Sequence, residues 1–178
     1  MQPLDIIDQY YAGNPELREI LLKHSQAVMQ RSLDICDRHP ELQADRLFIA
    51  EAAMIHDIGI CFCNAPGIRC YGTEPYICHG RLGAELMRKM GYDRHARVCE
   101  RHTGAGLTAE EIIRQQLPLP SEDFLPESIE EKIICYADKF YSKTRLDTEK
   151  TYEQALHSLE KFGTEGVERF QQWHLQFK

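Results

Sequence analysis

Residues 54–59 read Met-Ile-His-Asp-Ile-Gly and place an imidazole beside a carboxylate at the end of an apolar run. Both groups lose hydration among Ile and Met side chains, and the protein must replace that hydration with a partner. A metal ion is the partner best able to do so, because its charge compensates the carboxylate and it accepts imidazole as a ligand. We therefore expect further metal ligands elsewhere in the chain.

Helical periodicity surrounds this stretch on both sides. Apolar residues at spacings of three and four predict a helix over residues 15–38, with Asn14 as the cap and Pro15 in the first position. A second helix is predicted over residues 44–57, ended by Gly59. Its expected core-facing residues are Leu47, Ala50, Ala53 and Met54.

Further helices are predicted over residues 79–91, 93–102, 108–116, 128–143 and 152–173, with a weak point at Gly163 in the last. Residues 60–78 show no helical period, and so long an irregular stretch inside a compact domain favours a functional loop. In this loop Arg69, Tyr71 and Tyr76 either contact a substrate or hold the loop in place. No segment alternates convincingly with period two. We predict an all-α bundle that forms a single domain over residues 1–178.

The bulk composition limits the possible partners and compartment. The chain of 178 residues carries a formal charge of −7, so its surface as a whole repels long nucleic acid, whereas a small phosphorylated substrate remains compatible. No apolar run approaches the roughly 20 residues of a membrane span, and the N-terminus lacks a signal pattern, which predicts a cytoplasmic protein without membrane contact. The oligomeric state stays open, a homodimer included.

Seven cysteines are present, an odd number that favours free thiols over a disulfide framework in such a compartment. Four of them fall in or beside the loop: Cys61, Cys63, Cys70 and Cys78. A structural zinc site is the alternative explanation for these four. Their spacing lacks the paired C-x-x-C knuckles of such sites.

Six polar residues are predicted to point inward or to lie at the mouth of a helix. They are His24, His56, Asp57, His79, His102 and Asp138. A single buried histidine is more often bonded to a backbone carbonyl, but burying six titratable groups without a shared counter-ion would cost several kcal/mol each. Convergence on a cation is the simpler account. Of the other histidines, His157, His39 and His174 are expected in solvated or terminal positions. For His95 the sequence does not decide between a partly exposed position and one near the cluster.

The ligand set narrows the ion and the chemistry. Four imidazoles and two carboxylates are more ligands than one tetrahedral zinc ion can bind, but they suit two octahedral divalent ions that share a carboxylate. Asp57 is the best placed residue to supply the shared carboxylate. The same nitrogen and oxygen ligands accept Fe, Mn, Ni, Co or Mg. Two ions about 3.5 to 4 Å apart hold a hydroxide between them and neutralise a phosphoryl group under attack. Asp57 and His56 are thus the expected catalytic residues of a phosphate ester or anhydride hydrolase.

The ordered set of His24, the His56–Gly59 run, His79, His102 and Asp138 resembles the HD superfamily of metal-dependent phosphohydrolases in its HDIG-containing form. The match spans residues 24–138. The resemblance implies an all-helical HD fold in which His24, His56, Asp57 and Asp138 hold one ion, while Asp57, His79 and His102 hold the other.

Within the superfamily, the additional histidines and the Ala137-Asp138-Lys139 run resemble small bacterial enzymes that split diadenosine tetraphosphate. The segment 104–108 is more similar to small, uncharacterised HDIG proteins. A small nucleotide is therefore the expected substrate class, and Arg81 and Lys139, which adjoin predicted ligands, are candidate phosphate contacts. The alternative function is a metal-containing nucleotide-binding or sensor domain with little turnover.

Overall fold

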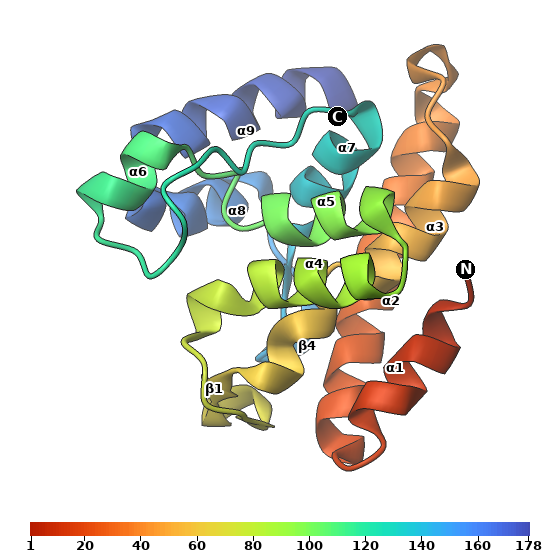
Figure 1. Cartoon of the computed structure of the whole chain (residues 1–178). Coiled ribbons are helices and arrows are strands. Elements are labelled where there is room, and N and C mark those ends of the chain that lie inside the picture. The colour runs from red at the N-terminus through yellow and green to blue at the C-terminus, as the bar shows by residue number, and fades with distance from the viewer.

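Helices dominate the computed structural model, which describes residues 1–178 (Figure 1). The α-helices are α1 Pro3–Tyr11, α2 Pro15–Arg38, α3 Arg46–Ile55, α4 His79–Lys89, α5 Asp93–Arg101, α6 Ala109–Arg114, α7 Ile129–Asp138, α8 Tyr152–Leu159 and α9 Thr164–Phe177. Short 3-10 turns cover Pro40–Leu42, Ile58–Phe62, Pro66–Ile68, Tyr76–Cys78 and Glu160–Phe162. The predicted all-α class is confirmed.

The strands are short and form two separate antiparallel pairs. In one pair β1 Asn64–Ala65 lies beside β2 Cys70–Tyr71, with Asn64 opposite Tyr71. In the other, β3 Tyr141–Ser142 lies beside β4 Arg145–Glu149, with Tyr141 opposite Glu149.

The long helix α2 is the central support of the fold. The side chain of Asn14 accepts a hydrogen bond from the backbone N–H of Leu17 at 3.1 Å, and Pro15 occupies the first turn, as the sequence predicted. One stripe of α2 is buried against α3 and α7. Within that stripe, His24 lies between Leu21 and Val28, which belong to different hydrophobic clusters.

These two clusters make up most of the core. One collects apolar residues of α2, α3, α5, α7, α8 and α9, among them the fully buried Phe170. The other collects residues of α1, α2, α3, α4 and α5 together with Ile58 and Ile60. Because α2 and α3 contribute to both clusters, polar side chains on these two helices can be held rigidly between them.

Helix α3 departs from the prediction in two details. Leu47, predicted to face the core, is 72% exposed, because the buried face instead carries Phe48 and Ile49. The helix ends at Ile55 without a left-handed residue, so Gly59 is not its cap. Gly59 is required by packing, since a Cβ there would lie 2.1 Å from the carbonyl oxygen of His79 in α4.

Three further segments differ from the sequence-based expectation. Helix α1 had no predicted counterpart. The helix predicted over residues 128–143 ends at Asp138, and the chain continues into the β3–β4 hairpin, whose strands are too polar and exposed to alternate visibly. The helix predicted over residues 152–173 is broken where its weak point was expected, at Gly163, which has a φ of +108°.

The remaining helices enclose this framework. Helices α4 and α5 lie side by side across the front of the molecule, and α8 and α9 lie behind and above them (Figure 1). None of the helices combines the length and the apolarity that a membrane crossing requires.

Candidate metal centre

All six predicted inward residues converge on one buried cluster. They come from α2, the end of α3, the turn that follows it, the start of α4, the end of α5 and the end of α7: His24, His56, Asp57, His79, His102 and Asp138. Each is almost completely shielded from solvent. Residues separated by more than a hundred positions in sequence thus meet at one point between the two hydrophobic clusters.

The carboxylate of Asp57 lies at the centre of this group. Its Oδ2 is 3.1 Å from the Nε2 atoms of both His24 and His56. Its other oxygen, Oδ1, is 3.3 Å from Nε2 of His79 and 3.2 Å from Nε2 of His102. The two oxygens therefore face two different pairs of imidazoles.

Asp138 completes the first of these sets. Its Oδ1 lies 2.9 Å from Nε2 of His24 and 3.4 Å from Nε2 of His56. The donor atoms of His24, His56, Asp57 and Asp138 lie within 4.8 Å of one another, and so do those of Asp57, His79 and His102. Two sets of residues, each able to hold an ion, share only Asp57.

Hydrogen bonds to the backbone orient three of the rings. Nδ1 of His56 bonds the carbonyl of Ala53 at 2.7 Å, and Nδ1 of His102 bonds the carbonyl of Cys99 at the same distance. Nδ1 of His79 bonds the carbonyl of Tyr76 at 2.6 Å. A carbonyl only accepts, so in each neutral ring the proton resides on Nδ1 and the lone pair on Nε2 points into the cluster. Metal-ligating histidines are oriented in this way.

Several atoms inside the cluster lack hydrogen-bond partners of their own. Nε2 of His24, Nε2 of His56 and both carboxylate oxygens of Asp57 are buried without a hydrogen bond of suitable angle, although possible partners lie near 3 Å and Nζ of Lys143 lies 2.6 Å from Oδ2 of Asp57. The distances are short but the angles do not suit mutual hydrogen bonding, as expected if the atoms aim at common points between them. Orphaned buried polar atoms of this kind fit a bound cation.

The ionisation of Asp57 and His79 matches this arrangement. Burial opposes the charge on Asp57, but Lys143 and His56 hold the pKa of its carboxyl well below the usual range. Burial is the largest effect on His79 and lowers the pKa of its ring to about 3; Asp57 raises the pKa but does not offset burial, to which His102 and Lys143 add, so this ring stays neutral. Ionised carboxylates and neutral imidazoles are the forms that bind metal ions.

Two lysines reach the cluster from α7 and the hairpin. Nζ of Lys143 lies 2.6 Å from Oδ2 of Asp57, and Nζ of Lys139 lies 2.6 Å from Oδ2 of Asp138. Lys139 was a predicted substrate contact, whereas Lys143 was missed, because the helix predicted to residue 143 gave no reason to turn its side chain inward. The hairpin that follows α7 brings it there.

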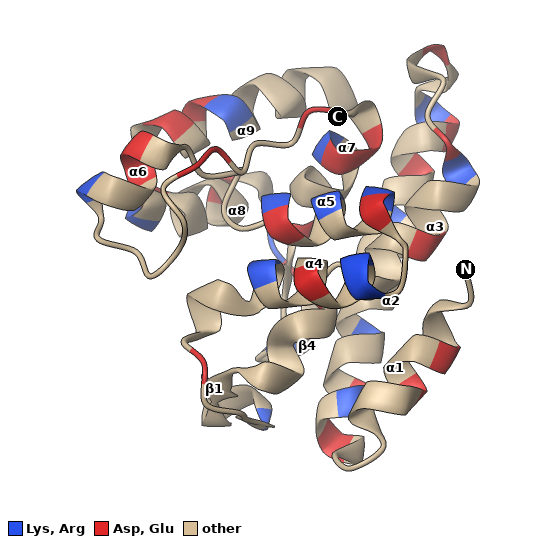
Figure 2. Cartoon of the chain, in the orientation of Figure 1, with Lys and Arg blue, Asp and Glu red and all other residues tan.

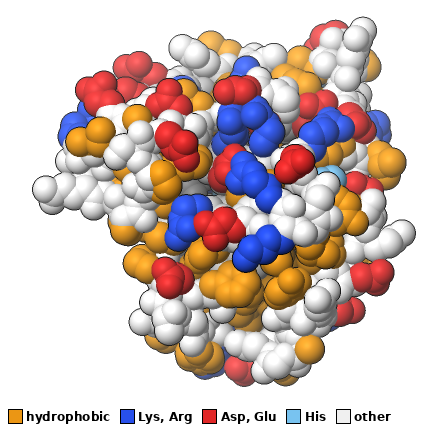
Figure 3. Space-filling view, in the orientation of Figure 1, with side chains coloured by type: hydrophobic (Ala, Val, Ile, Leu, Met, Phe, Trp, Pro, Cys, Tyr) orange, Lys and Arg blue, Asp and Glu red, His pale blue; other side chains and the backbone are white.

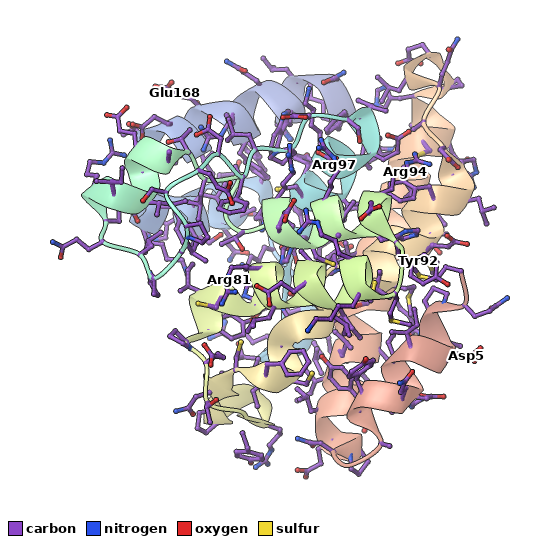
Figure 4. The ribbon with its side chains drawn as sticks, viewed as in Figure 1. Asp5, Arg81, Tyr92, Arg94, Arg97 and Glu168 are labelled. Atoms are coloured by element: carbon purple, nitrogen blue, oxygen red, sulfur yellow. The ribbon has the colours of Figure 1, made fainter.

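Arg81 does not lie at the cluster. On α4, a residue two positions after His79 is turned by about 200° around the helix axis, onto the outer face. Its guanidinium pairs with Glu85, and Arg81 lines a small surface pocket instead of the cavity beside the cluster. Figure 4 shows it on the outward side of α4. The structure gives no support to its predicted role in substrate binding.

The other histidines stay apart from the cluster. His95 is buried, but its Nε2 faces Glu51 at 3.1 Å, on the far side of α3. His157 is exposed, as the sequence predicted. His174 bonds the hydroxyl of Tyr136 at 2.8 Å and stacks on Tyr152.

The structure does not support the alternative of a zinc site in the loop. All seven cysteines are free thiols, and no group of three or more of them lies close enough to hold an ion. The thiols of Cys61, Cys63 and Cys78 instead donate to the carbonyls of Ile58, Gly59 and Pro118. They pack as small apolar groups with a weak donor.

A cavity of about 510 Å³ opens beside the cluster. His79, His102 and Asp138 of the cluster line it, together with the loop residues Ala65, Gly67, Ile68 and Tyr76. Residues of the hairpin and of the end of α8 complete the lining. A volume of this size accommodates a small molecule such as a nucleotide.

Comparison with known proteins places the chain among HD-domain proteins. The family model described as HD domain matches residues 21–142. An uncharacterised protein of Methanocaldococcus jannaschii is 34% identical over 145 residues, which is 78% of this chain and 78% of that protein. No solved structure shows a significant match.

Two longer relatives carry the name tRNA (cytidine(56)-2'-O)-methyltransferase. The one from Picrophilus torridus is 37% identical over 129 residues, 72% of this chain and 33% of that protein. The one from Thermoplasma volcanium is 28% identical over 173 residues, 96% of this chain and 44% of that protein. This chain thus matches a third to less than half of the length of these relatives. The matched family model covers more than half of the chain and includes all six residues of the cluster, and the chain therefore belongs to the HD-domain family.

Proposed function

We propose that this protein is a metal-dependent phosphohydrolase acting on a small phosphorylated substrate, most simply a nucleotide. The observation that carries the proposal is the placement of Asp57, whose two oxygens face two separate imidazole pairs, one of which, His79 and His102, lines a cavity. One divalent ion would be held by His24, His56, Asp57 and Asp138, and a second by Asp57, His79 and His102. Ions held in this way supply Lewis-acid charge and lower the pKa of water, which serves phosphoryl transfer to water.

The chain's own groups then orient the substrate. The ammonium groups of Lys139 and Lys143 stand beside the two carboxylates and line the cavity, where they can bind the non-bridging oxygens of a phosphoryl group. Tyr76 stacks on the ring of His79 with centroids 4.7 Å apart and covers the cluster from the loop side. The shielding of the cluster from water strengthens each of these electrostatic contacts.

The proposal is tested with the purified protein loaded with manganese or ferrous iron. We expect release of phosphate or of a shorter nucleotide from a panel of nucleotides, dinucleoside polyphosphates and sugar phosphates. Asp57→Ala is expected to abolish this release, and Asp5→Ala, an exposed carboxylate on α1 (Figure 4), is the matched control. Silence of the metal-loaded protein across the whole panel would exclude the hydrolase.

A second candidate is a metal-containing nucleotide-binding domain with little turnover. It is favoured by the two longer relatives, in which the segment similar to this chain is part of a larger protein named for another reaction. Tight nucleotide binding without product release over hours would select this candidate. Methyl transfer to tRNA is not assigned to this chain, because its similarity covers only 33% and 44% of the proteins that carry that name.

We place long nucleic acid outside the set of partners. The net charge is −7, and the basic side chains on the face over α4 and α5 are interspersed with acidic ones (Figures 2 and 3). On that face Arg88 is paired with Glu100, and Arg97 with Glu127 and Glu131. Such neutralised arginines offer little to a phosphate backbone.

A further inference from the structure

The cavity beside the cluster contains more positive charge than a single phosphoryl group needs. Besides Lys139 and Lys143, it is lined by Lys150 at the end of the hairpin and by Lys161 in the 3-10 turn Glu160–Phe162. Lys150 and Lys161 both lie beyond the residues 21–142 that match the HD model. They therefore belong to the C-terminal segment that the HD model does not cover.

These two lysines have no counter-charge of their own. Lys139 and Lys143 are paired with Asp138 and Asp57, whereas neither Lys150 nor Lys161 makes an ion pair. Nζ of Lys161 lies over the ring of Phe162, 4.9 Å from its centroid. The lysines thus differ from Arg88 and Arg97 on the outer surface, which are paired with carboxylates.

The lysines also repel one another. Burial lowers the pKa of the half-buried Lys150, and although Asp138 opposes this, the charges of Lys139, Lys161 and Lys143 lower the pKa further. Ammonium groups that share a cavity without enough carboxylates disfavour the folded state. An anion in the cavity would relieve this repulsion, and its benefit would grow with its charge.

We propose that Lys150 and Lys161 form a second phosphate subsite, so that the protein selects ligands with two or more linked phosphate groups. One phosphate would lie at the metal cluster with Lys139 and Lys143, and the next would lie against Lys150 and Lys161. The hydroxyls of Thr103 and Ser142 also line the cavity and add neutral donors. This assignment rests on the proposed function for the position of the first phosphate.

The test measures binding with probes that resist hydrolysis. Isothermal titration compares methylphosphonate, which carries one phosphonate, with methylenediphosphonate, which carries two linked ones. Every titration contains the same free manganese concentration, so that chelation of manganese by the diphosphonate contributes equally for all variants. The variants are Lys150→Met, Lys161→Met and their combination. Lys89→Met, an exposed lysine on α4 away from the cavity, is the matched control.

We expect the wild type to bind the diphosphonate at least about tenfold more tightly than the monophosphonate, since a charge-assisted hydrogen bond is worth roughly that factor. The double variant should lose this preference and keep its affinity for methylphosphonate, and Lys89→Met should retain both. Lys161→Met alone changes an exposed side chain, so its smaller loss of preference cannot come from misfolding.

Equal binding of the two probes by the wild type, or an unchanged preference in the double variant, would overturn the subsite. Failure of the proposed function has a different signature. A wild type that prefers the diphosphonate but releases no phosphate from any substrate would refute the hydrolase and leave the subsite in place.

Discussion

Nε2 of His79 lies 3.0 Å from Nε2 of His102, although the hydrogen bonds made by both Nδ1 atoms leave a lone pair on each of these nitrogens. Two lone pairs at this distance repel each other unless a cation lies between or beside them. The pair also faces the same oxygen of Asp57. A metal ion is the cation that this geometry suits.

Removal of one member of the pair should remove one ion. His102→Ala is expected to lower the metal content by about one equivalent per chain, because Asp57 and His79 alone make a weak site, while the far-ultraviolet circular dichroism stays helical. Metal content is measured by mass spectrometry after gel filtration. His157→Ala, an exposed histidine, is the control. Wild-type stoichiometry in His102→Ala would indicate a mononuclear centre at the first set of residues.

Replacement of Asp57 should affect both ions. Its two oxygens face different imidazole pairs, so Asp57→Ala is expected to reduce the occupancy of both sites and not of one alone. The same metal analysis checks this. If Asp57→Ala loses a single equivalent, Asp57 does not bridge the two sites.

The metal ligands could be predicted from the sequence because each of these residues interrupts an apolar pattern. His24 falls on the stripe between Leu21 and Val28, and Asp138 follows the apolar face of α7. A polar residue at such a position needs a partner in any fold, and periodicity alone reveals it. The sequence therefore predicted which residues converge, without showing how they face one another.

The lysines of the cavity were not accessible in the same way. Lys143 and Lys150 lie in a hairpin of exposed, polar strands, and nothing in a run such as Tyr141–Lys150 indicates which side chains point toward α2. Their inward direction results from tertiary contacts of β3 and β4 with α2. Arg81 was predicted to contact the substrate because it is close to His79 in sequence, but its side chain does not lie at the site.

A glycine is required at position 59, but the reason predicted from the sequence, the termination of α3, is wrong. A Cβ at this position would lie 2.5 Å from the backbone nitrogen of Gly83 as well as against His79. Gly59→Ala must push α4 away from the turn that carries Asp57, at an expected cost of about 3 kcal/mol in the free energy of unfolding. Urea denaturation measures it. Gly13→Ala, where a Cβ meets nothing within 4 Å, should change stability by less than about 0.5 kcal/mol.

The stability of the metal-free protein should depend on pH through the same histidines. Burial lowers the pKa of His79 from its ordinary 6.5 to about 3. Between these two pH values only the unfolded chain takes up this proton, so the stability of the folded protein decreases as the pH is lowered below 6.5. Burial also disfavours charge on His56, but Asp57 and Asp138 outweigh it and raise the pKa to about 9. That contribution is complete below pH 6.5 and is lost as pH rises through 9.

We therefore expect the melting temperature of chelator-treated protein to be highest near pH 6.5 and to fall on both sides. Thermal denaturation between pH 5 and about 9.5 tests this. His56→Gln should flatten the alkaline side, whereas His157→Gln should leave the profile unchanged. A melting temperature that keeps rising to pH 9 would contradict the assignment.

The loop after His102 depends on a buried ion pair from α9. The guanidinium of Arg169 donates to the carbonyls of Ala105 and Gly106 at 2.9 Å and pairs with Glu111, whose side chain is only 1% exposed. Arg169→Met leaves the buried carboxylate of Glu111 with only the backbone N–H of Thr108 and no cationic partner, and it removes the donor to two carbonyls, so we expect a loss of about 3 kcal/mol in the free energy of unfolding. Urea denaturation at neutral pH is the measurement, and Arg145→Met, an exposed arginine without an ion pair, is the control. An Arg169→Met variant as stable as Arg145→Met would show that this pair does not hold the loop that follows His102.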